Sequence, residues 1–312
     1  MRLLDHRILV VTGKGGVGKT TVCACLGLMA AAQGKRVLIT ETSGAQALPS
    51  LFGVQSKGYE PVVLAERLET LSITPLQAIE DYVVQQIRVR RLYTMVFKNR
   101  VMAPFVDAVP GLHDAVQLGK VWDCAEQARD ASGKPRWDLV IVDAPATGHG
   151  LTMLEAPRSM MELTRRGPMF KGNQKVEAVL GDPAATRIVL VCLPEDMPVS
   201  ETLDLQTRLG DRKDQLSLCV LNEIHPRPPI TESEWAAARQ SLEEEPDPAL
   251  GEAISLVDQW QARVRRQDQA RLRLSRGLGL PVTDMPFLFH RDLDPADLLR
   301  LSEAIAPLVA SL

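Results

Sequence analysis

Near the start of the chain stands Gly13-Lys14-Gly15-Gly16-Val17-Gly18-Lys19-Thr20-Thr21, a glycine-rich stretch that fits the pattern G-x-x-x-x-G-K-[ST] at every fixed position. A strand-like apolar run, residues 7–12, precedes it, and residues 21–33 have a helical pattern. Glycines allow the backbone to curl so that successive N–H groups face phosphate oxygens, and the helix N-terminus adds partial positive charge. The stretch therefore predicts a phosphate-binding loop between a strand and a helix.

Two side chains of this loop have predicted roles in binding a nucleoside triphosphate. We expect Lys19 to reach the β- and γ-phosphates, and we expect the Thr20 hydroxyl to ligate Mg²⁺. ATP and Mg²⁺ are therefore the expected cofactors. The whole loop is expected to contact the nucleotide, through Gly13, Lys14, Gly15, Gly16, Val17, Gly18, Lys19, Thr20 and Thr21.

Composition indicates a single soluble domain over residues 1–312, with 45% hydrophobic and 4% aromatic residues. The net charge of −3 argues against a nucleic-acid partner. The longest apolar run, residues 22–32, is far shorter than the roughly 20 residues of a transmembrane helix, so no stable membrane insertion is expected. The chain begins without a cleavable signal, which predicts a cytoplasmic protein.

Five cysteines are spread along the chain, and no two of them form a C-x-x-C motif. An odd number of separated cysteines in a cytoplasmic protein predicts reduced thiols, mostly in the core. Within one subunit, metal binding by these thiols is not expected, whereas a metal shared between two subunits stays open. The five are Cys23, Cys25, Cys124, Cys192 and Cys219.

The second lysine of the loop, Lys14, directly follows the first glycine and gives the string G-K-G-G-V-G-K-T-T. This string resembles the deviant P-loop of the family that contains the arsenite-pump ATPase, the tail-anchored-protein targeting ATPase, the cell-division and plasmid-partitioning ATPases and nitrogenase iron protein. The resemblance implies that Lys14 crosses a dimer interface to the nucleotide of the partner subunit. We therefore expect a homodimer, or a heterodimer with a related ATPase chain.

A second strand pattern, residues 137–143, is apolar and ends in Asp143, as a Walker B strand does. Asp143 is expected near Mg²⁺, with a water molecule between them, and is a catalytic candidate together with Lys14 and Lys19. The residues that follow resemble the D-x-A-P-T-G-H segment of the arsenite-pump and tail-anchor branch. That resemblance implies a nucleotide-sensing switch at Thr147, Gly148 and His149, although His149 is equally well interpreted as a packing histidine.

The other switch is expected after the strand at residues 36–40. In the resembled branch this segment carries an aspartate that orients the attacking water, and alignment of the strand puts Ser43 in its place. Loss of such a group typically lowers the rate by about 10² to 10⁴. Glu41 is the candidate substitute, and otherwise hydrolysis is slow or a partner supplies the residue.

The adenine base has expected contacts near the end of the chain. The strand at residues 216–222 ends in Asn222, whose amide suits the adenine edge because it donates and accepts at once. The resemblance implies this role for Asn222, and it implies that Pro286 and Phe287 flank the base. The alternative for Asn222 is an ordinary turn residue at the end of a strand.

Two helical insertions are expected at about residues 76–125 and 155–180, and both contain methionines. The tail-anchor targeting relatives carry a methionine-rich groove for hydrophobic segments in these regions, and methionine surfaces adapt to varied apolar partners. The alternative is that these are core methionines. The candidate groove residues are Met95, Met102, Met153, Met160, Met161 and Met169.

Together these patterns predict an α/β fold: a doubly wound, mostly parallel sheet of the P-loop NTPase type, with a helical subdomain inserted over the nucleotide site. The resemblance implies a Mg-ATP-dependent dimeric switch ATPase whose helical subdomain binds a partner, a protein or a hydrophobic segment as cargo. One alternative is a catalytically weak nucleotide-binding scaffold that pairs with an active paralogue. The other is a partitioning-type surface ATPase, which the T-G-H segment and the non-basic helix near residues 295–312 disfavour.

Overall fold

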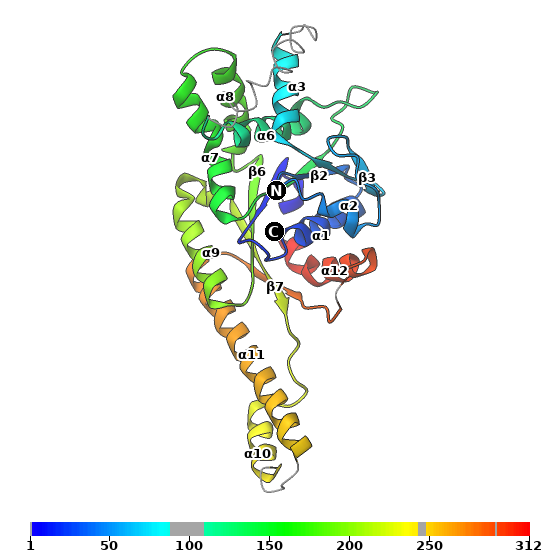
Figure 1. Cartoon of the computed structure of the whole chain (residues 1–312), viewed down its shortest axis with the longest axis vertical. Coiled ribbons are helices and arrows are strands. Elements are labelled where there is room, and N and C mark those ends of the chain that lie inside the picture. The colour runs from blue at the N-terminus through cyan, green and yellow to red at the C-terminus, as the bar shows by residue number, and fades with distance from the viewer. Residues whose placement is uncertain (1, 88–108, 243–247, 291) are drawn as a thin grey trace.

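The computed structural model describes residues 2–87, 109–242, 248–290 and 292–312, and its centre is one eight-stranded sheet (Figure 1). The strands lie side by side in the order β3-β4-β2-β5-β1-β6-β7-β8. Their bounds are β1 Ile8–Thr12, β2 Val37–Glu41, β3 Val62–Ala65, β4 Leu68–Ser72, β5 Leu139–Asp143, β6 Thr186–Cys192, β7 Leu216–Ile224 and β8 Val282–Pro286.

The sheet is parallel except at one edge, where β3 runs antiparallel to β4. Every residue of β1, β2 and β5 is buried, as expected for central parallel strands that helices cover on both faces. The predicted α/β fold with a mostly parallel sheet is confirmed. β1 lies at the point where the strand order reverses, which is where open α/β sheets bind ligands at the carboxyl ends of their strands.

Successive residues of β1 point to opposite faces of the sheet and so enter two separate cores. Leu9 and Val11 pack in the core under α1 and α12, whereas Ile8 and Val10 pack in the core under α6, α7, α9 and α11. The helices are α1 Lys19–Ala32, α2 Ala47–Leu51, α3 Pro75–Ile87, α6 Leu112–Trp122, α7 Thr147–Thr164, α8 Pro168–Leu180, α9 Asp196–Arg208, α10 Glu232–Leu242, α11 Pro248–Leu278 and α12 Pro295–Ser311.

Figure 1 shows α3, α6, α7 and α8 grouped beyond one end of the sheet, while α11 runs toward the opposite end of the molecule, where α10 lies beside it. The ranges predicted for the two insertions contain α6, α8 and most of α3 and α7, and residues 88–108 lie outside the described chain. The division of the chain into one domain with two insertions stays a prediction. Among the described residues, no helix combines the length and apolar character that a membrane span requires.

Several element boundaries differ from the sequence-based expectations. α1 begins at Lys19 and not at residue 21, because Gly18, with φ of 90°, is where the left-handed loop turns into the helix. α7 begins at Thr147, inside the segment expected to form the second switch, so this helix follows β5 almost directly. The short elements α2 and β3, and the helix α9, were not predicted.

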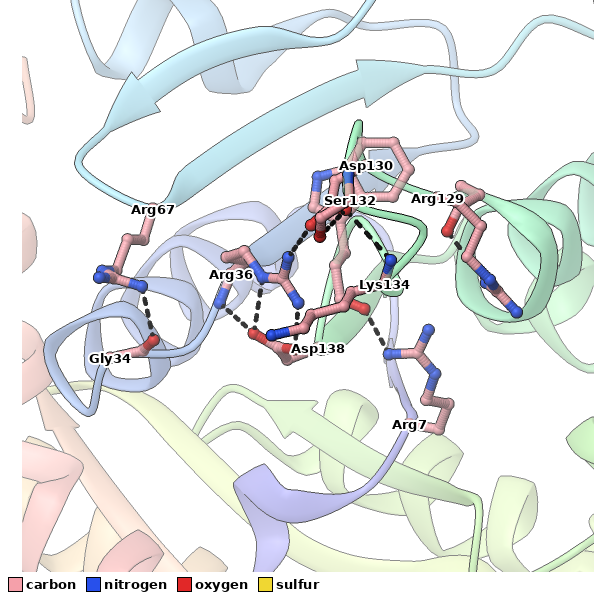
Figure 2. A network of polar contacts seen from close by, with 11 residues as sticks. Arg7, Gly34, Arg36, Arg67, Arg129, Asp130, Ser132, Lys134 and Asp138 are labelled. Carbon is pink, nitrogen blue, oxygen red and sulfur yellow. Dashed lines mark hydrogen bonds and ion pairs between the residues drawn. The ribbon is translucent and has the colours of Figure 1, made fainter.

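A polar network at the amino-terminal edge of the sheet aligns the starts of three strands (Figure 2). Arg36, just before β2, donates to the carboxylate of Asp138, just before β5, at 2.8 and 3.1 Å, and to Asp130 at 2.9 Å. Arg7, just before β1, donates to the carbonyl oxygens of Trp137 and Ala125. The hydrogen bonds from Arg36 hold the pKa of Asp138 below its usual value. Because β1, β2 and β5 start in register, their carboxyl ends also lie in register.

A buried arginine attaches the helices α7 and α8 to the sheet. Arg212 lies in the helical turn Gly210–Gln215 and is 3% exposed. Its guanidinium donates to the carbonyl oxygens of Leu154 in α7 and Leu180 in α8, at 3.0 and 2.9 Å, and to the Glu177 carboxylate at 2.7 Å. The Arg212 side chain therefore holds one residue of α7 and two residues of α8.

Replacing Arg212 with leucine should lower the free energy of unfolding by about 2 kcal/mol, because the Leu154 carbonyl loses this donor and the mostly buried Glu177 carboxylate is left with the more exposed Arg158. Urea denaturation followed by circular dichroism measures the change. The matched control is Arg208→Leu, where an exposed ion pair with Asp204 at 3.8 Å is lost, and there we expect about 0.5 kcal/mol or less. Equal losses for the two variants would contradict the structural role given to Arg212.

Candidate functional site

The loop between β1 and α1 lies so close to its neighbours that glycine is required at two positions. A β-carbon at Gly13 would lie 2.2 Å from the carbonyl oxygen of Val191 in β6. A β-carbon at Gly18 would lie 2.2 Å from the Asn222 amide nitrogen, and Gly18 also has a left-handed φ of 90°. The fixed glycines of the sequence motif are therefore explained by two contacts from β6 and β7.

Lys19, the motif lysine, folds back over the loop. Its ammonium group donates to the carbonyl oxygens of Gly13 at 3.2 Å and Lys14 at 2.9 Å. Burial lowers the pKa of Lys19, while the nearby charge of Asp143 opposes that shift. A partly desolvated cation at the mouth of the loop is well placed to attract phosphate oxygens.

Thr20 and Asp143 meet at the start of α1. The Thr20 hydroxyl donates to the Asp143 carboxylate at 2.6 Å, and Asp143 is 4% exposed at the end of β5. Burial raises the pKa of this carboxyl, and the Thr20 hydrogen bond and the Lys19 charge lower it in part. The sequence-predicted magnesium pair is therefore brought together.

These two oxygen donors fit a hard divalent cation such as Mg²⁺, which prefers oxygen ligands. No group of three or more His, Cys, Asp or Glu side chains within the described ranges could hold a metal ion. Mg²⁺ typically takes one or two protein oxygens and completes its shell with phosphate and water, as the Thr20 hydroxyl and the Asp143 carboxylate would allow. All five cysteines are free and buried, so the expected thiols are found in the core.

Glu41 ends β2 directly opposite Asp143 in the register of the sheet. One of its carboxylate oxygens accepts from the backbone N–H groups of Ala47 at 2.6 Å and Leu48 at 3.1 Å, at the start of α2. The other oxygen is buried without a partner, and burial raises the pKa of the group. Ser43, by contrast, is exposed, and its hydroxyl accepts only a long contact of 3.5 Å from the Ala45 N–H.

The second predicted switch forms the first turn of α7. Gly148 and His149 are exposed there, and a β-carbon at the neighbouring Gly150 would lie 2.8 Å from the Thr12 hydroxyl at the end of β1. Asp114 on α6 lies near enough to His149 for their charges to interact: burial raises the pKa of Asp114, and the histidine charge opposes the shift. The switch segment is thus close to both β1 and α6. The sensing roles of Thr147, Gly148 and His149 stay predictions.

Asn222 is a buried residue of β7, and its amide donates to the carbonyl oxygen of Val17 at 2.9 Å. This bond ties the phosphate-binding loop to a third strand, a contact that was not predicted. Pro286 ends β8, and the Phe287 ring stacks on His225 with centroids 4.4 Å apart. Phe287 lines a cavity of about 480 Å³ beside the end of β7. Adenine recognition by Asn222, Pro286 and Phe287 stays a prediction.

Lys14 reaches its own α9. Its ammonium group lies 2.8 Å from a carboxylate oxygen of Glu201 and contacts the sulfur of Met197. Neither residue belongs to a sequence motif, so sequence reasoning had no signal for them. The side chains of Lys14 and Glu201 are 32% and 39% exposed.

The predicted methionine groove needs correction. Met153 and Met160 are 1% and 2% exposed and belong to the apolar core, because they lie on the side of α7 that packs inward. Met161 is half-buried, and Met169 lines a cavity of about 240 Å³ between α3, α6 and α8. Met95 and Met102 lie outside the described residues. The core interpretation therefore applies to two of the six methionines.

The geometry defines the class of protein. A glycine loop, its lysine and a threonine–aspartate pair lie at the carboxyl ends of β1 and β5, where the order of a mostly parallel sheet reverses. This arrangement is that of a P-loop NTPase.

The family follows from comparison with known proteins. The model of the anion-transporting ATPase family (ArsA_ATPase) matches residues 6–173, more than half of the chain, and the chain belongs to this family of ATPases. ATPase BagA of Mycobacterium tuberculosis is 30% identical over 237 residues, which cover 72% of this chain and 67% of the relative.

Two further relatives are also named as ATPases. The putative arsenical pump-driving ATPase of Halobacterium salinarum is 27% identical over 238 residues, 71% of this chain and 36% of the relative. ATPase GET3 of Lachancea thermotolerans is 26% identical over 253 residues, 70% of this chain and 72% of the relative. The predicted ATPase activity and family are confirmed, and hydrolysis is favoured over the scaffold alternative.

Replacing Asp143 with asparagine should stabilise the nucleotide-free protein at pH 7 and abolish most of its activity. Asparagine still accepts from Thr20, but it removes a charge that burial disfavours. The stability that a protonated Asp143 contributes is full below its unfolded pKa of about 3.8, and it is lost as the pH rises through the raised folded pKa. The difference in unfolding free energy between variant and wild type should therefore shrink as the pH falls from 7 toward the unfolded pKa of about 3.8. Mg-ATP hydrolysis should fall about 100-fold.

Urea unfolding at several pH values and phosphate release test both parts. Asp138→Asn is the matched control, because the hydrogen bonds from Arg36 lower the pKa of Asp138 and its charge therefore stabilises the fold at pH 7. We expect this control to be less stable than the wild type and to keep its activity. Two variants that change stability in the same direction would refute the electrostatic account of Asp143.

Proposed function

We propose that this chain is a dimeric, Mg-ATP-dependent switch ATPase, either a homodimer or a heterodimer with a related ATPase chain. The observation that carries the proposal is the meeting of Lys19, Thr20 and Asp143 beside the two segments that leave β2 and β5. Those segments begin α2 and α7, so a change at the phosphates can reach two helices directly. Switch proteins of this kind order such segments around the γ-phosphate and release them after hydrolysis.

Phosphoryl transfer is mainly a matter of positioning and charge neutralisation. Lys19 and the N–H groups of the loop would hold the phosphates. Thr20 would ligate Mg²⁺, with Asp143 behind it, and the bound ion would neutralise charge that develops during transfer. The buried position of Asp143 would strengthen these electrostatic interactions, because water is largely excluded there.

Lys14 would act across the dimer interface, on the nucleotide of the partner subunit. In this chain its ammonium group contacts Glu201, and both side chains are about one-third exposed. An exposed ion pair of this kind contributes about 1 kcal/mol or less. A phosphate group presented by the partner can therefore displace Glu201 at little cost.

The helical group over the site would bind a partner, either a protein or a hydrophobic segment as cargo. The cavity between α3, α6 and α8 supports this part of the proposal, because Tyr82, Trp122 and Met169 give it apolar surface beside charged groups such as Asp81 and Lys120. A cavity of about 240 Å³ is large enough to accept one or two apolar side chains. We place the protein in the cytoplasm as part of the same proposal.

Lys19→Ala and Lys14→Ala should have different kinetic effects. Loss of Lys19 should weaken ATP binding at least tenfold, because the phosphates lose a direct cation. Loss of Lys14 should leave ATP binding within about threefold and lower hydrolysis by about 10² or more, because a cation supplied in trans stabilises charge in the transition state. Nucleotide titration and phosphate release measure the two effects.

Mixing two inactive variants tests whether Lys14 acts across the interface. A dimer of one Lys14→Ala chain and one Asp143→Asn chain has one complete site, because the Lys14→Ala chain keeps Asp143 and receives Lys14 from its partner. In a homodimer, an equal mixture should regain about a quarter of the wild-type activity, since half of the dimers are mixed and each has one complete site. A mixture that is no more active than its components would show that Lys14 does not act in trans within a homodimer.

Glu41, we propose, orients the attacking water in place of the carboxylate that Ser43 lacks. Its unpaired buried oxygen and its position opposite Asp143 support this role. Glu41→Gln should lower kcat about 100-fold and leave ATP binding within about threefold. Ser43→Ala is the matched control and should stay within about twofold of wild type. A Glu41→Gln variant with normal kcat would mean that another group orients the water.

A further inference from the structure

One buried amide connects α6 to the ends of two strands beside the nucleotide site. Gln117, in the middle of α6, is 5% exposed. Its side-chain nitrogen donates to the carbonyl oxygen of Thr42 at 3.0 Å and to that of Ile73 at 2.7 Å. Thr42 directly follows β2, and Ile73 directly follows β4. A planar amide with two N–H donors can satisfy both carbonyl groups at once.

The two acceptor residues are in turn bonded to the site itself. The N–H group and the hydroxyl of Thr42 donate to the backbone carbonyl oxygen of Asp143, at 3.4 and 2.9 Å. The N–H group of Ile73 donates to the carbonyl oxygen of Glu41 at 2.8 Å. A continuous set of hydrogen bonds therefore runs from the magnesium-side aspartate and from Glu41 to the side chain of Gln117.

The other face of α6 belongs to the helical group. Ala115, Val116, Gly119 and Lys120 line the cavity that α6 shares with α3 and α8. Figure 1 shows α6 between the sheet and the helices α3 and α8. The helix is thus in contact with the nucleotide site through one side chain and with the helical group through a whole face.

We propose that Gln117 is a positioning residue that transmits the state of the nucleotide site to the helical group. This rests on the proposed function, in which the segment after β2 responds to the γ-phosphate. When Thr42 shifts with that segment, its carbonyl group either carries the Gln117 amide along or leaves a buried polar group without a partner. The second outcome is disfavoured, because buried backbone carbonyl groups are nearly always hydrogen-bonded. α6 therefore moves with Thr42, and the cavity changes shape.

Gln117→Met tests the proposal, because methionine keeps the length of the side chain and removes both donors. Hydrogen–deuterium exchange is measured over residues 112–122 and 168–180, without nucleotide and with Mg²⁺ and a non-hydrolysable ATP analogue. In the wild type we expect the analogue to change exchange in both segments. In Gln117→Met we expect this change to fall at least threefold, with kcat lowered about tenfold and analogue affinity kept within about threefold.

The matched control is Gln206→Met, which removes a similar amide bond, from α9 to the Leu278 carbonyl oxygen at 2.7 Å. We expect this control to keep both the exchange response and kcat. A full exchange response in Gln117→Met would overturn the role of Gln117 and leave the proposed switch function intact. A wild-type protein that hydrolyses ATP with no exchange response in these helices would overturn the proposed movement, and Gln117 coupling with it.

Discussion

The hydrogen bond from the Thr20 hydroxyl to the Asp143 carboxylate, at 2.6 Å, joins two parts of the chain that are 123 residues apart. It forms because β1 pairs in parallel with β5 and places Val11 opposite Asp143, at the edge where the phosphate-binding loop begins. The polar network of Arg7, Arg36 and Asp138 aligns the opposite ends of β1, β2 and β5 (Figure 2). The site therefore depends on strand register, and strand register depends on contacts at both the amino and the carboxyl ends of these strands.

The site concentrates ionisable groups whose charged forms are disfavoured by burial. Burial raises the pKa of Asp143 and of Glu41 and lowers that of Lys19. Groups perturbed in this way are typical of functional sites, because a bound ligand of the right charge relieves the cost. A magnesium–phosphate complex would match this need, because Asp143 would stabilise its cation and Lys19 would stabilise its oxygens. The same buried charges that favour nucleotide binding thus lower the stability of the nucleotide-free protein.

Three helices begin at, or contact, the carboxyl ends of the strands beside the phosphate-binding loop. They connect the site to the rest of the molecule. α2 begins on the Glu41 carboxylate, and α7 begins just after Asp143. α6 contacts the strand ends through Gln117 and the helices α3 and α8 through its opposite face. The geometry therefore offers a direct physical route between phosphate chemistry and the surface that we propose binds a partner.

The sequence by itself determined the loop, the strand that ends in Asp143 and the mostly parallel α/β class, because each depends on residues that are neighbours along the chain. It did not determine the contacts of Lys14 with Glu201, of Asn222 with Val17 or of Gln117 with Thr42, and it left open whether Met153 and Met160 line a groove or fill a core. Only the tertiary structure decided these, because strand order and helix packing bring together residues that no local pattern relates.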